Sequence, residues 1–171
     1  MAGPLEGIKV VELGVWVAGP AAGGGILADW GGADVVKIEP PTGDPGRMFG
    51  RMLGLDDDEK NPPFEMDNRS KRSIVLDLTT DGGGWQPLAN CCRPQTFFVT
   101  NVRPDALARL DLDYEKVATL NPGLVYGLIT GYGETGPEAN RPAYDVAAFW
   151  ARSGGGRPAD PPPGDSPPFQ R

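Results

Sequence analysis

The sequence lacks the residue types on which the commonest catalytic groups depend. It contains no histidine, which excludes Ser-His-Asp and Cys-His nucleophiles, histidine general bases and histidine metal ligands. Its only cysteines, Cys91 and Cys92, are neighbours in the chain. Adjacent cysteines rarely bridge each other, so we predict no disulfide framework and a reducing compartment. We also predict no catalytic role for this pair and no metal site.

Basic residues cluster beside two of the predicted strands. Arg69, Lys71 and Arg72 precede one strand, and Arg103 and Arg109 follow another. Arginine forks and lysine ammonium groups bind phosphate well through charge-assisted hydrogen bonds. The spacing fits either a phosphate contact or a solvated surface, and no P-loop motif is present.

The segment Gly131–Gly136, GYGETG, matches the pattern of a dinucleotide-binding loop. Pro137 follows at once and no helix is predicted after it, and the preceding strand is the last of the predicted sheet. We therefore predict a glycine-rich loop over a ligand or a tight turn, with an NAD-type Rossmann site as the alternative.

Two groups of carboxylates have plain structural interpretations. The acidic run 56–59, DDDE, is expected to be a solvated loop rather than a metal site. Asp145 begins the last predicted helix, where the helix dipole favours a carboxylate. An orienting or catalytic acid is the alternative for Asp145 if a substrate binds on that side.

The elements that must position these residues alternate along the chain. Runs rich in β-branched and aromatic residues predict strands at residues 8–13, 33–39, 73–78, 96–101 and 124–130. Helices are predicted at residues 20–30, 104–110, 114–120 (capped by Asp113) and 144–152. Residues 40–64 are predicted to be a long surface excursion, and residues 80–93 a poor crossover helix, because that segment contains three consecutive glycines and Pro87.

This order predicts an α/β fold, a Rossmann-like open parallel sheet with helices on both faces. Ligands of such sheets bind beyond the carboxyl ends of the strands, near helix N-termini. The places to search are therefore the segments that directly follow the strands.

Length and composition limit the organisation and the partners. The chain has 171 residues and a net charge of −7, which argues against a nucleic-acid binder with a broad basic face. No membrane span and no signal peptide are visible, so a cytoplasmic protein is expected. Glycine and proline concentrate in residues 153–171, which predicts a disordered tail after a domain at residues 1–152.

Several long stretches together resemble the N-terminal part of family III CoA-transferases, the group that includes formyl-CoA transferase, carnitine CoA-transferase and α-methylacyl-CoA racemase. The matching stretches are residues 4–14, 17–47, 68–80, 98–137 and 141–145. The combination is specific, although each piece alone is not. Residues 82–95 and 153–168 do not resemble the family, and a frameshifted or truncated reading frame is our hypothesis for this.

The resemblance implies a CoA-binding part of a large Rossmann-like domain at residues 1–152, incomplete in this chain, and an interlocked homodimer. It implies coenzyme A as a substrate rather than a permanently bound cofactor, with an acyl-CoA and a carboxylic acid acceptor as partners. The CoA contacts that it implies are Val17, Ala18, Pro40, Leu76, Asp77, Leu78, Thr79, Asn101, Val102, Arg103 and Arg109. Some relatives carry Arg in place of Pro40 and Lys in place of Thr79, which weakens the expected phosphate binding.

The family chemistry implies a nucleophilic aspartate that attacks the acyl-CoA thioester. We expect that aspartate beyond Arg171, so no catalytic residue is assigned, and Asp145 is a candidate orienting acid. Tyr144 stands where the racemase branch has histidine, which favours a transferase. The expectation is a CoA-transferase truncated before its nucleophile and inactive alone. The alternatives are a racemase-type enzyme and a non-catalytic CoA-binding fragment.

Overall fold

A parallel five-stranded sheet forms the centre of the N-terminal part of the chain. The computed structural model describes residues 3–55, 61–80, 85–92, 97–144 and 146–153. The chain divides into two compact units, Met1–Ile129 and Thr130–Arg171, which are described separately below. The predicted boundary between residues 152 and 153 stays a prediction.

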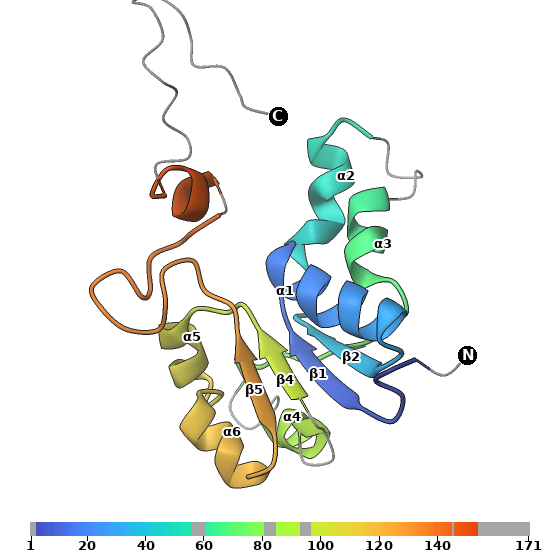
Figure 1. Ribbon diagram of the computed structural model, residues 1–171, viewed down its shortest axis with the longest axis vertical. Coiled ribbons are helices and arrows are strands. Elements are labelled where there is room, and N and C mark those ends of the chain that lie inside the picture. The colour runs from blue at the N-terminus through green and yellow to red at the C-terminus, as the bar shows by residue number, and fades with distance from the viewer. Residues whose placement is uncertain (1–2, 56–60, 81–84, 93–96, 145, 154–171) are drawn as a thin grey trace, which may run out of the picture. The chain divides into compact units, whose positions relative to one another are not determined.

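The sheet has the strand order β3-β2-β1-β4-β5 (Figure 1). Its strands are β1 (Lys9–Leu13), β2 (Asp34–Glu39), β3 (Arg72–Val75), β4 (Phe97–Thr100) and β5 (Val125–Leu128). All four pairings are parallel, which confirms the predicted open parallel sheet. The order reverses between β1 and β4, and ligands of open α/β sheets bind beside such a switch point.

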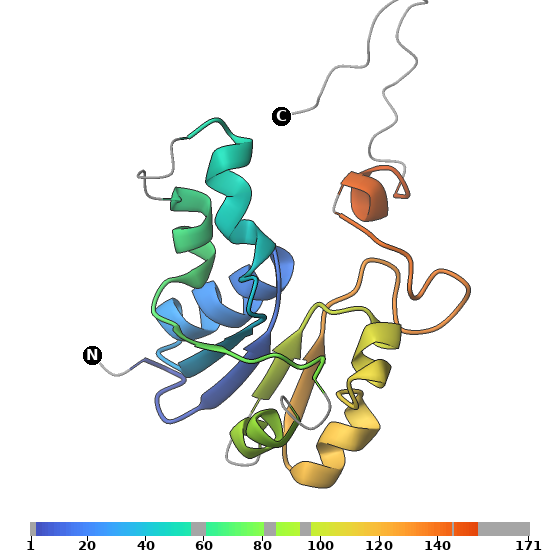
Figure 2. The same ribbon diagram turned by 180° about the vertical axis from the view of Figure 1, so that it is seen from behind.

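Helices cover both faces of the sheet, as predicted. The helices of the first unit are α1 (Ala18–Pro20), η1 (Ala21–Trp30), η2 (Pro45–Met48), α2 (Phe49–Met52), α3 (Pro62–Asn68), α4 (Trp85–Cys92), α5 (Pro104–Arg109) and α6 (Tyr114–Leu120). The second unit contains η3 (Val146–Trp150). The helix predicted at residues 20–30 is present, and η1 within it is π-helical, a form that occurs frequently at functional sites. Seen from both sides, η1 lies on one face of the sheet and α4 on the other (Figures 1 and 2).

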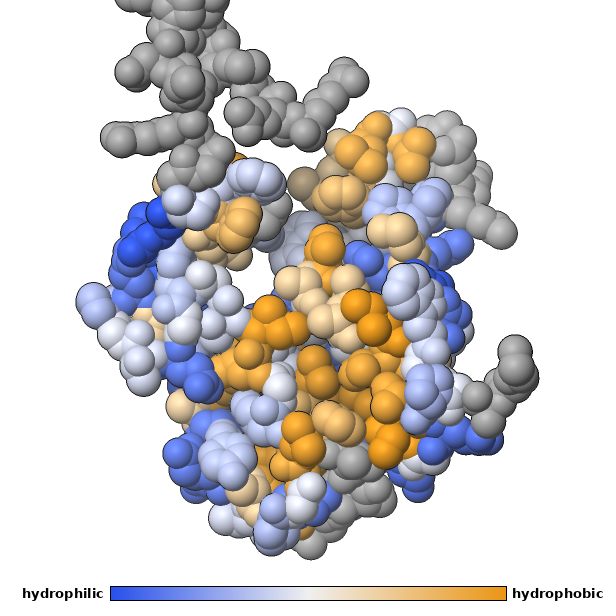
Figure 3. Space-filling view, viewed as in Figure 1, coloured by the Kyte–Doolittle hydropathy of each residue, from blue (hydrophilic) through white to orange (hydrophobic). Residues whose placement is uncertain are grey.

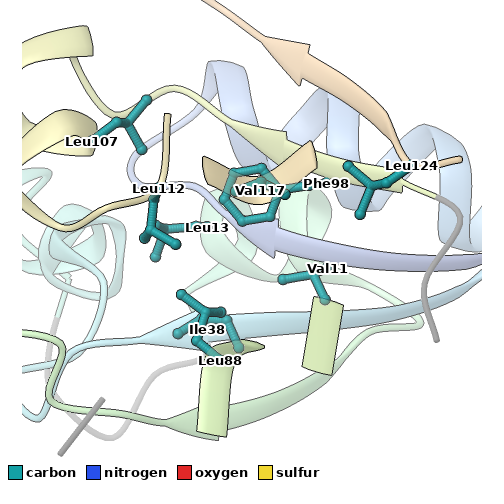
Figure 4. Close-up of a cluster of buried hydrophobic side chains, with 9 residues drawn as sticks. All are labelled: Val11, Leu13, Ile38, Leu88, Phe98, Leu107, Leu112, Val117 and Leu124. Carbon is teal, nitrogen blue, oxygen red and sulfur yellow. The ribbon is translucent and has the colours of Figure 1, made fainter. Parts of the chain in front are cut away.

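The core is split by the sheet into two layers. On one face the larger cluster joins the strands to α4 through Leu88, to α5 through Leu107 and to α6 through Val117 (Figure 4). On the other face the smaller cluster joins Val10 and Val35 to η1. The three central strands β1, β2 and β4 therefore bury both of their faces, as the near-continuous apolar runs of a parallel sheet require.

Short helices, which the sequence did not predict, form within the surface excursion expected at residues 40–64. Asp44 accepts a hydrogen bond from the Gly46 amide (2.8 Å), with Pro45 as the first residue of η2. Asn61 accepts one from the Phe64 amide (3.2 Å) at the start of α3, which also begins with proline. These side-chain caps satisfy amides that a short helix leaves free.

Three other expected elements differ in extent. The strand predicted at residues 73–78 ends at Val75, because Asp77 then closes a turn with Thr79. The poor crossover helix still forms, as α4, since the burial of Leu88 and Ala89 outweighs its weak propensity. The last predicted helix is the short π-helical η3.

Apolar side chains gather on the surface around η1 and the strands beside it (Figure 3). Ile26 and Trp30 of η1 and Val125 of β5 are largely exposed, whereas Phe97 and Ile129 are half-buried against the smaller cluster. Among the described helices, none is long and apolar enough to cross a membrane.

Candidate functional site

The carboxyl ends of β1, β2, β3 and β4 lie along one edge of the sheet, because all these strands run the same way. All the sequence-predicted contacts except Arg109 lie in the segments that follow these ends. They are Val17 and Ala18 after β1, Pro40 after β2, Leu76, Asp77, Leu78 and Thr79 after β3, and Asn101, Val102 and Arg103 after β4. The fold therefore brings four separate stretches of sequence to one edge.

Asn101 joins the two central strand ends at the switch point. Its side-chain oxygen accepts a hydrogen bond from the Val15 amide (2.9 Å) and its side-chain nitrogen donates one to the Val15 carbonyl (2.8 Å). A Cβ atom at Gly19 would lie 2.7 Å from the same oxygen, so only glycine fits there. The two hydrogen bonds between Asn101 and Val15 fix the loop that presents the exposed residues Val17 and Ala18.

Arg109 is the last residue of α5, one helix length beyond the edge. Its guanidinium donates to Asp105 in the first turn of the same helix (3.1 Å), so the side chain turns back toward the strand ends. The Arg109 hydrogen bond lowers the pKa of the Asp105 carboxyl. Arg103, which precedes α5, and Arg109, at the end of α5, are both exposed, as a phosphate contact requires.

After β3 the predicted contacts have a partly structural role. Asp77 accepts hydrogen bonds from the Thr79 amide (2.9 Å) and hydroxyl (2.6 Å), and these bonds lower the pKa of its carboxyl. Leu76 and Leu78 pack against the larger core cluster. This turn therefore leaves the exposed Thr79 as the polar residue best placed to meet a ligand.

The basic side chains of the cluster before β3 form ion pairs with carboxylates of the same chain. Arg69 pairs with Asp29 (2.6 Å) and Arg72 pairs with Asp34 (2.7 Å), at the opposite edge of the sheet. Only 2% of the Lys71 side chain is exposed. Burial lowers the pKa of the Lys71 amine, and the side chain cannot reach a soluble phosphate.

A small pocket beside Val17 went unnoticed in the sequence. It encloses about 210 Å³, including the solvent at its mouth, and it is lined by Trp16, Val17, Gly46, Phe49, Pro63, Phe64 and Asp67. Burial raises the pKa of the Asp67 carboxyl. Trp16 has a φ of 63°, a left-handed conformation that a bulky residue rarely adopts. In the sequence, the pocket is indicated only by Phe49 and Phe64, which lie in the helices α2 and α3 that the sequence did not predict.

The glycine-rich segment forms a turn rather than a dinucleotide site. Gly133 and Gly136 adopt φ values of 88° and 93°, and residues 137–144 contain no helix. A helix N-terminus for a pyrophosphate is therefore missing in the described part of this segment. The predicted tight turn explains the motif.

The remaining candidates contribute little to the described site. Asp145, residues 56–60 and the tail from residue 154 lie outside the described residues. Cys91 is a half-buried free thiol. No group of three potential metal-binding side chains occurs within the described ranges.

Comparisons with known proteins agree on one family. A sequence model of CoA-transferase family III matches residues 5–169. The chain is 39% identical over 151 residues to (R)-2-hydroxy-4-methylpentanoate CoA-transferase of Clostridioides difficile. It is 42% identical over 154 residues to cinnamoyl-CoA:phenyllactate CoA-transferase of Clostridium sporogenes. Each match covers 88% of this chain but only 37% and 36% of the relative.

Solved structures show the same relationship. The crystal structure of Rv3272 from Mycobacterium tuberculosis superimposes with a TM-score of 0.81 at 32% identity, covering 98% of this chain and 44% of that one. A CAIB/BAIF family protein from Brucella suis gives 0.75 at 38% identity, covering 85% and 38%. The chain thus spans about a third of the length of the curated relatives that it matches.

Proposed function

Because the chain belongs to CoA-transferase family III, we propose that it is the CoA-binding part of an enzyme that moves CoA between an acyl-CoA thioester and a carboxylic acid. In this proposal the eleven residues implied by the resemblance bind CoA along the carboxyl edge of the sheet. The acyl group and the acceptor acid are left open.

One observation supports the proposal above the others. Four strand ends that are far apart in the sequence present the predicted contacts other than Arg109 at a single edge, beside the switch point of the sheet. Ligands of open α/β sheets bind at this place. The exposed arginines Arg103 and Arg109 supply positive charge there, which suits the phosphates of CoA.

The chemistry of the proposed reaction is covalent catalysis by a carboxylate. An aspartate oxygen would bond to the thioester carbon, and the carbon–sulfur bond would break to release CoA thiolate and leave a mixed anhydride. The thiolate would then attack the aspartyl carbonyl, releasing the first acid and forming an enzyme thioester from which the acceptor acid collects CoA. We assign this aspartate to no residue of the chain. Tyr144, at the position of the racemase histidine, disfavours a racemase.

A non-catalytic CoA-binding fragment is the second candidate function. It requires only the contacts that the strand ends present and no nucleophile. Both candidates require CoA binding, so binding is the first experiment. The interlocked homodimer implied by the resemblance belongs to the first candidate and stays a proposal.

Titration calorimetry of the chain with CoA tests the binding site. We expect heat at millimolar CoA, and a Kd raised about fivefold by Arg109→Ala, the effect of about 1 kcal/mol from an exposed charge-assisted contact. Arg72→Ala is the matched control, because both side chains are 67% exposed with one carboxylate partner each, at opposite edges of the sheet. No heat, or equal affinity in Arg109→Ala, would count against the site.

A further inference from the structure

We propose that a buried ion network of Glu12, Lys37, Asp44 and Lys71 positions the loop of residues 14–20 for CoA binding, with Lys37 as its central positioning residue. The proposal rests on the proposed function for its ligand. Its claim about the loop stands on the geometry of this chain.

The network is a linear series of ion pairs, in the order Asp44, Lys37, Glu12 and Lys71, at the end of β1 and β2. Lys37 Nζ lies 3.0 Å from Glu12 Oε1 and 2.8 Å from Asp44 Oδ2. The other Glu12 oxygen, Oε2, lies 2.8 Å from Lys71 Nζ. Glu12 and Lys37 are register partners in the sheet. At most 2% of any of these four side chains is exposed, so solvent does not screen the pairs.

Three of the four charged groups, Lys37, Asp44 and Lys71, also hold a backbone atom of the loop. Lys37 Nζ donates to the Gly14 carbonyl (2.8 Å) and Lys71 Nζ donates to the Pro20 carbonyl (2.9 Å). Asp44 Oδ1 accepts from the Trp16 amide (3.0 Å). The network thus fixes the two ends and the middle of the loop.

These anchors surround the two exposed residues without touching them. Asn101 holds Val15 by two further hydrogen bonds, which leaves Val17 and Ala18 as the loop's exposed residues. A loop held at its start, its middle and its end keeps these two residues in place for a ligand. Such preorganisation lowers the cost of binding.

Stability alone is a weak reason for this arrangement. Buried ion pairs contribute little net stability, since apolar residues of similar volume often serve as well or better. The neighbouring positions on the same face, Val10 and Val35, are indeed apolar. An apolar side chain at position 37 could not hold the Gly14 carbonyl, and that backbone contact distinguishes a positioning role from a packing role.

Amide hydrogen exchange measures the loop directly, without a ligand. In Lys37→Met, which keeps the length of the side chain but removes its charge, we expect the Val15 and Trp16 amides to exchange about tenfold faster relative to the sheet amides. Val35→Ala is the control: it removes packing from the same face of β2 but touches no loop atom in the network. If Lys37→Met does not fold, Asp44→Ala takes its place, because Asp44 lies outside the sheet.

Calorimetry with CoA on the same variants tests the function of the loop. We expect Kd to rise about tenfold in Lys37→Met and to stay unchanged in Val35→Ala. Equal loop exchange in the two variants, or unchanged CoA affinity in folded Lys37→Met, would overturn the inference. Absence of binding in the unsubstituted chain would instead sink the proposed function, and the exchange data would still decide whether the network sets the loop.

Discussion

At the scale of single residues, Glu39 shows how the end of β2 is tied to the segment that follows it. Its buried carboxylate accepts two hydrogen bonds from Arg47 (2.8 and 2.7 Å), one from the Ser73 hydroxyl (2.7 Å) and one from the Asp44 amide (3.0 Å). The Arg47 hydrogen bonds, more than the other donors, hold the pKa of Glu39 at about 2, below its ordinary value of 4.5. The charged form of Glu39 therefore stabilises the fold.

This pKa predicts a loss of stability in acid. Because the folded pKa is depressed, the contribution is complete above pH 4.5 and is lost as the pH falls toward about 2. We expect a loss of about 2 kcal/mol over this window, after allowance for the half-exposed Arg47. Urea unfolding at several pH values measures it.

Arg47→Gln supplies the comparison for that experiment. The variant should be less stable at pH 7 and should lose less stability between pH 4.5 and 2. Burial raises the pKa of Glu12, an effect of opposite sign that both proteins share and that cancels in their difference. Parallel pH profiles of the two proteins would contradict the assignment to Glu39.

At the scale of elements, the sequence located strands better than helices. The runs IKVVEL, ADVVKIE and TFFVTN each contain the observed strand, because β-branched and aromatic residues mark buried strands directly. The sequence did not predict the helices between residues 45 and 68. Each of η2 and α3 begins with one polar capping residue followed by proline, and this combination also occurs in loops. The strand-end location of the site followed from topology, whereas the buried network did not, because its partners lie up to 59 residues apart in sequence.

Asn61 illustrates what those caps contribute. Besides capping α3, its side-chain nitrogen donates to the Gly46 carbonyl (3.1 Å) and the Arg47 carbonyl (2.9 Å), which ties α3 to η2. We expect Asn61→Ala to lower the free energy of unfolding by about 2–3 kcal/mol, as one cap and two further hydrogen bonds are lost. Thermal or urea unfolding measures the change.

Asp113 provides the matched cap for comparison. Its carboxylate accepts the Lys116 amide (3.0 Å) at the start of α6, so Asp113→Ala should cost about 1 kcal/mol. Equal costs for the two variants would show that the carbonyl contacts of Asn61 contribute nothing.

At the scale of the whole molecule, the N-terminal unit combines a five-stranded parallel sheet with an open apolar surface (Figure 3). Ile26, Trp30 and Val125 are among its exposed large apolar residues, and apolar residues gather on the surface around η1 and the strands beside it (Figure 3). The solved relatives contain more than half of their length beyond the matched part. We therefore test CoA binding and CoA transfer separately, because only transfer requires a nucleophilic carboxylate.

The 171-residue polypeptide alone should not transfer CoA. Transfer needs a carboxylate held within bonding reach of the thioester carbon, because position and orientation supply much of the rate. At the strand ends, Asp77 and Asp105 are already bonded to Thr79 and Arg109, and these bonds lower the pKa of each carboxyl. A carboxylate stabilised in this way is a weaker nucleophile. Incubation with a short acyl-CoA and a panel of carboxylic acids, followed by hydroxylamine trapping of any enzyme anhydride, should therefore yield neither a new thioester nor a hydroxamate. Turnover that disappears in Asp145→Ala or Asp165→Ala would overturn this expectation and identify that residue as the nucleophile, whereas turnover restored by a downstream segment of a relative would support it.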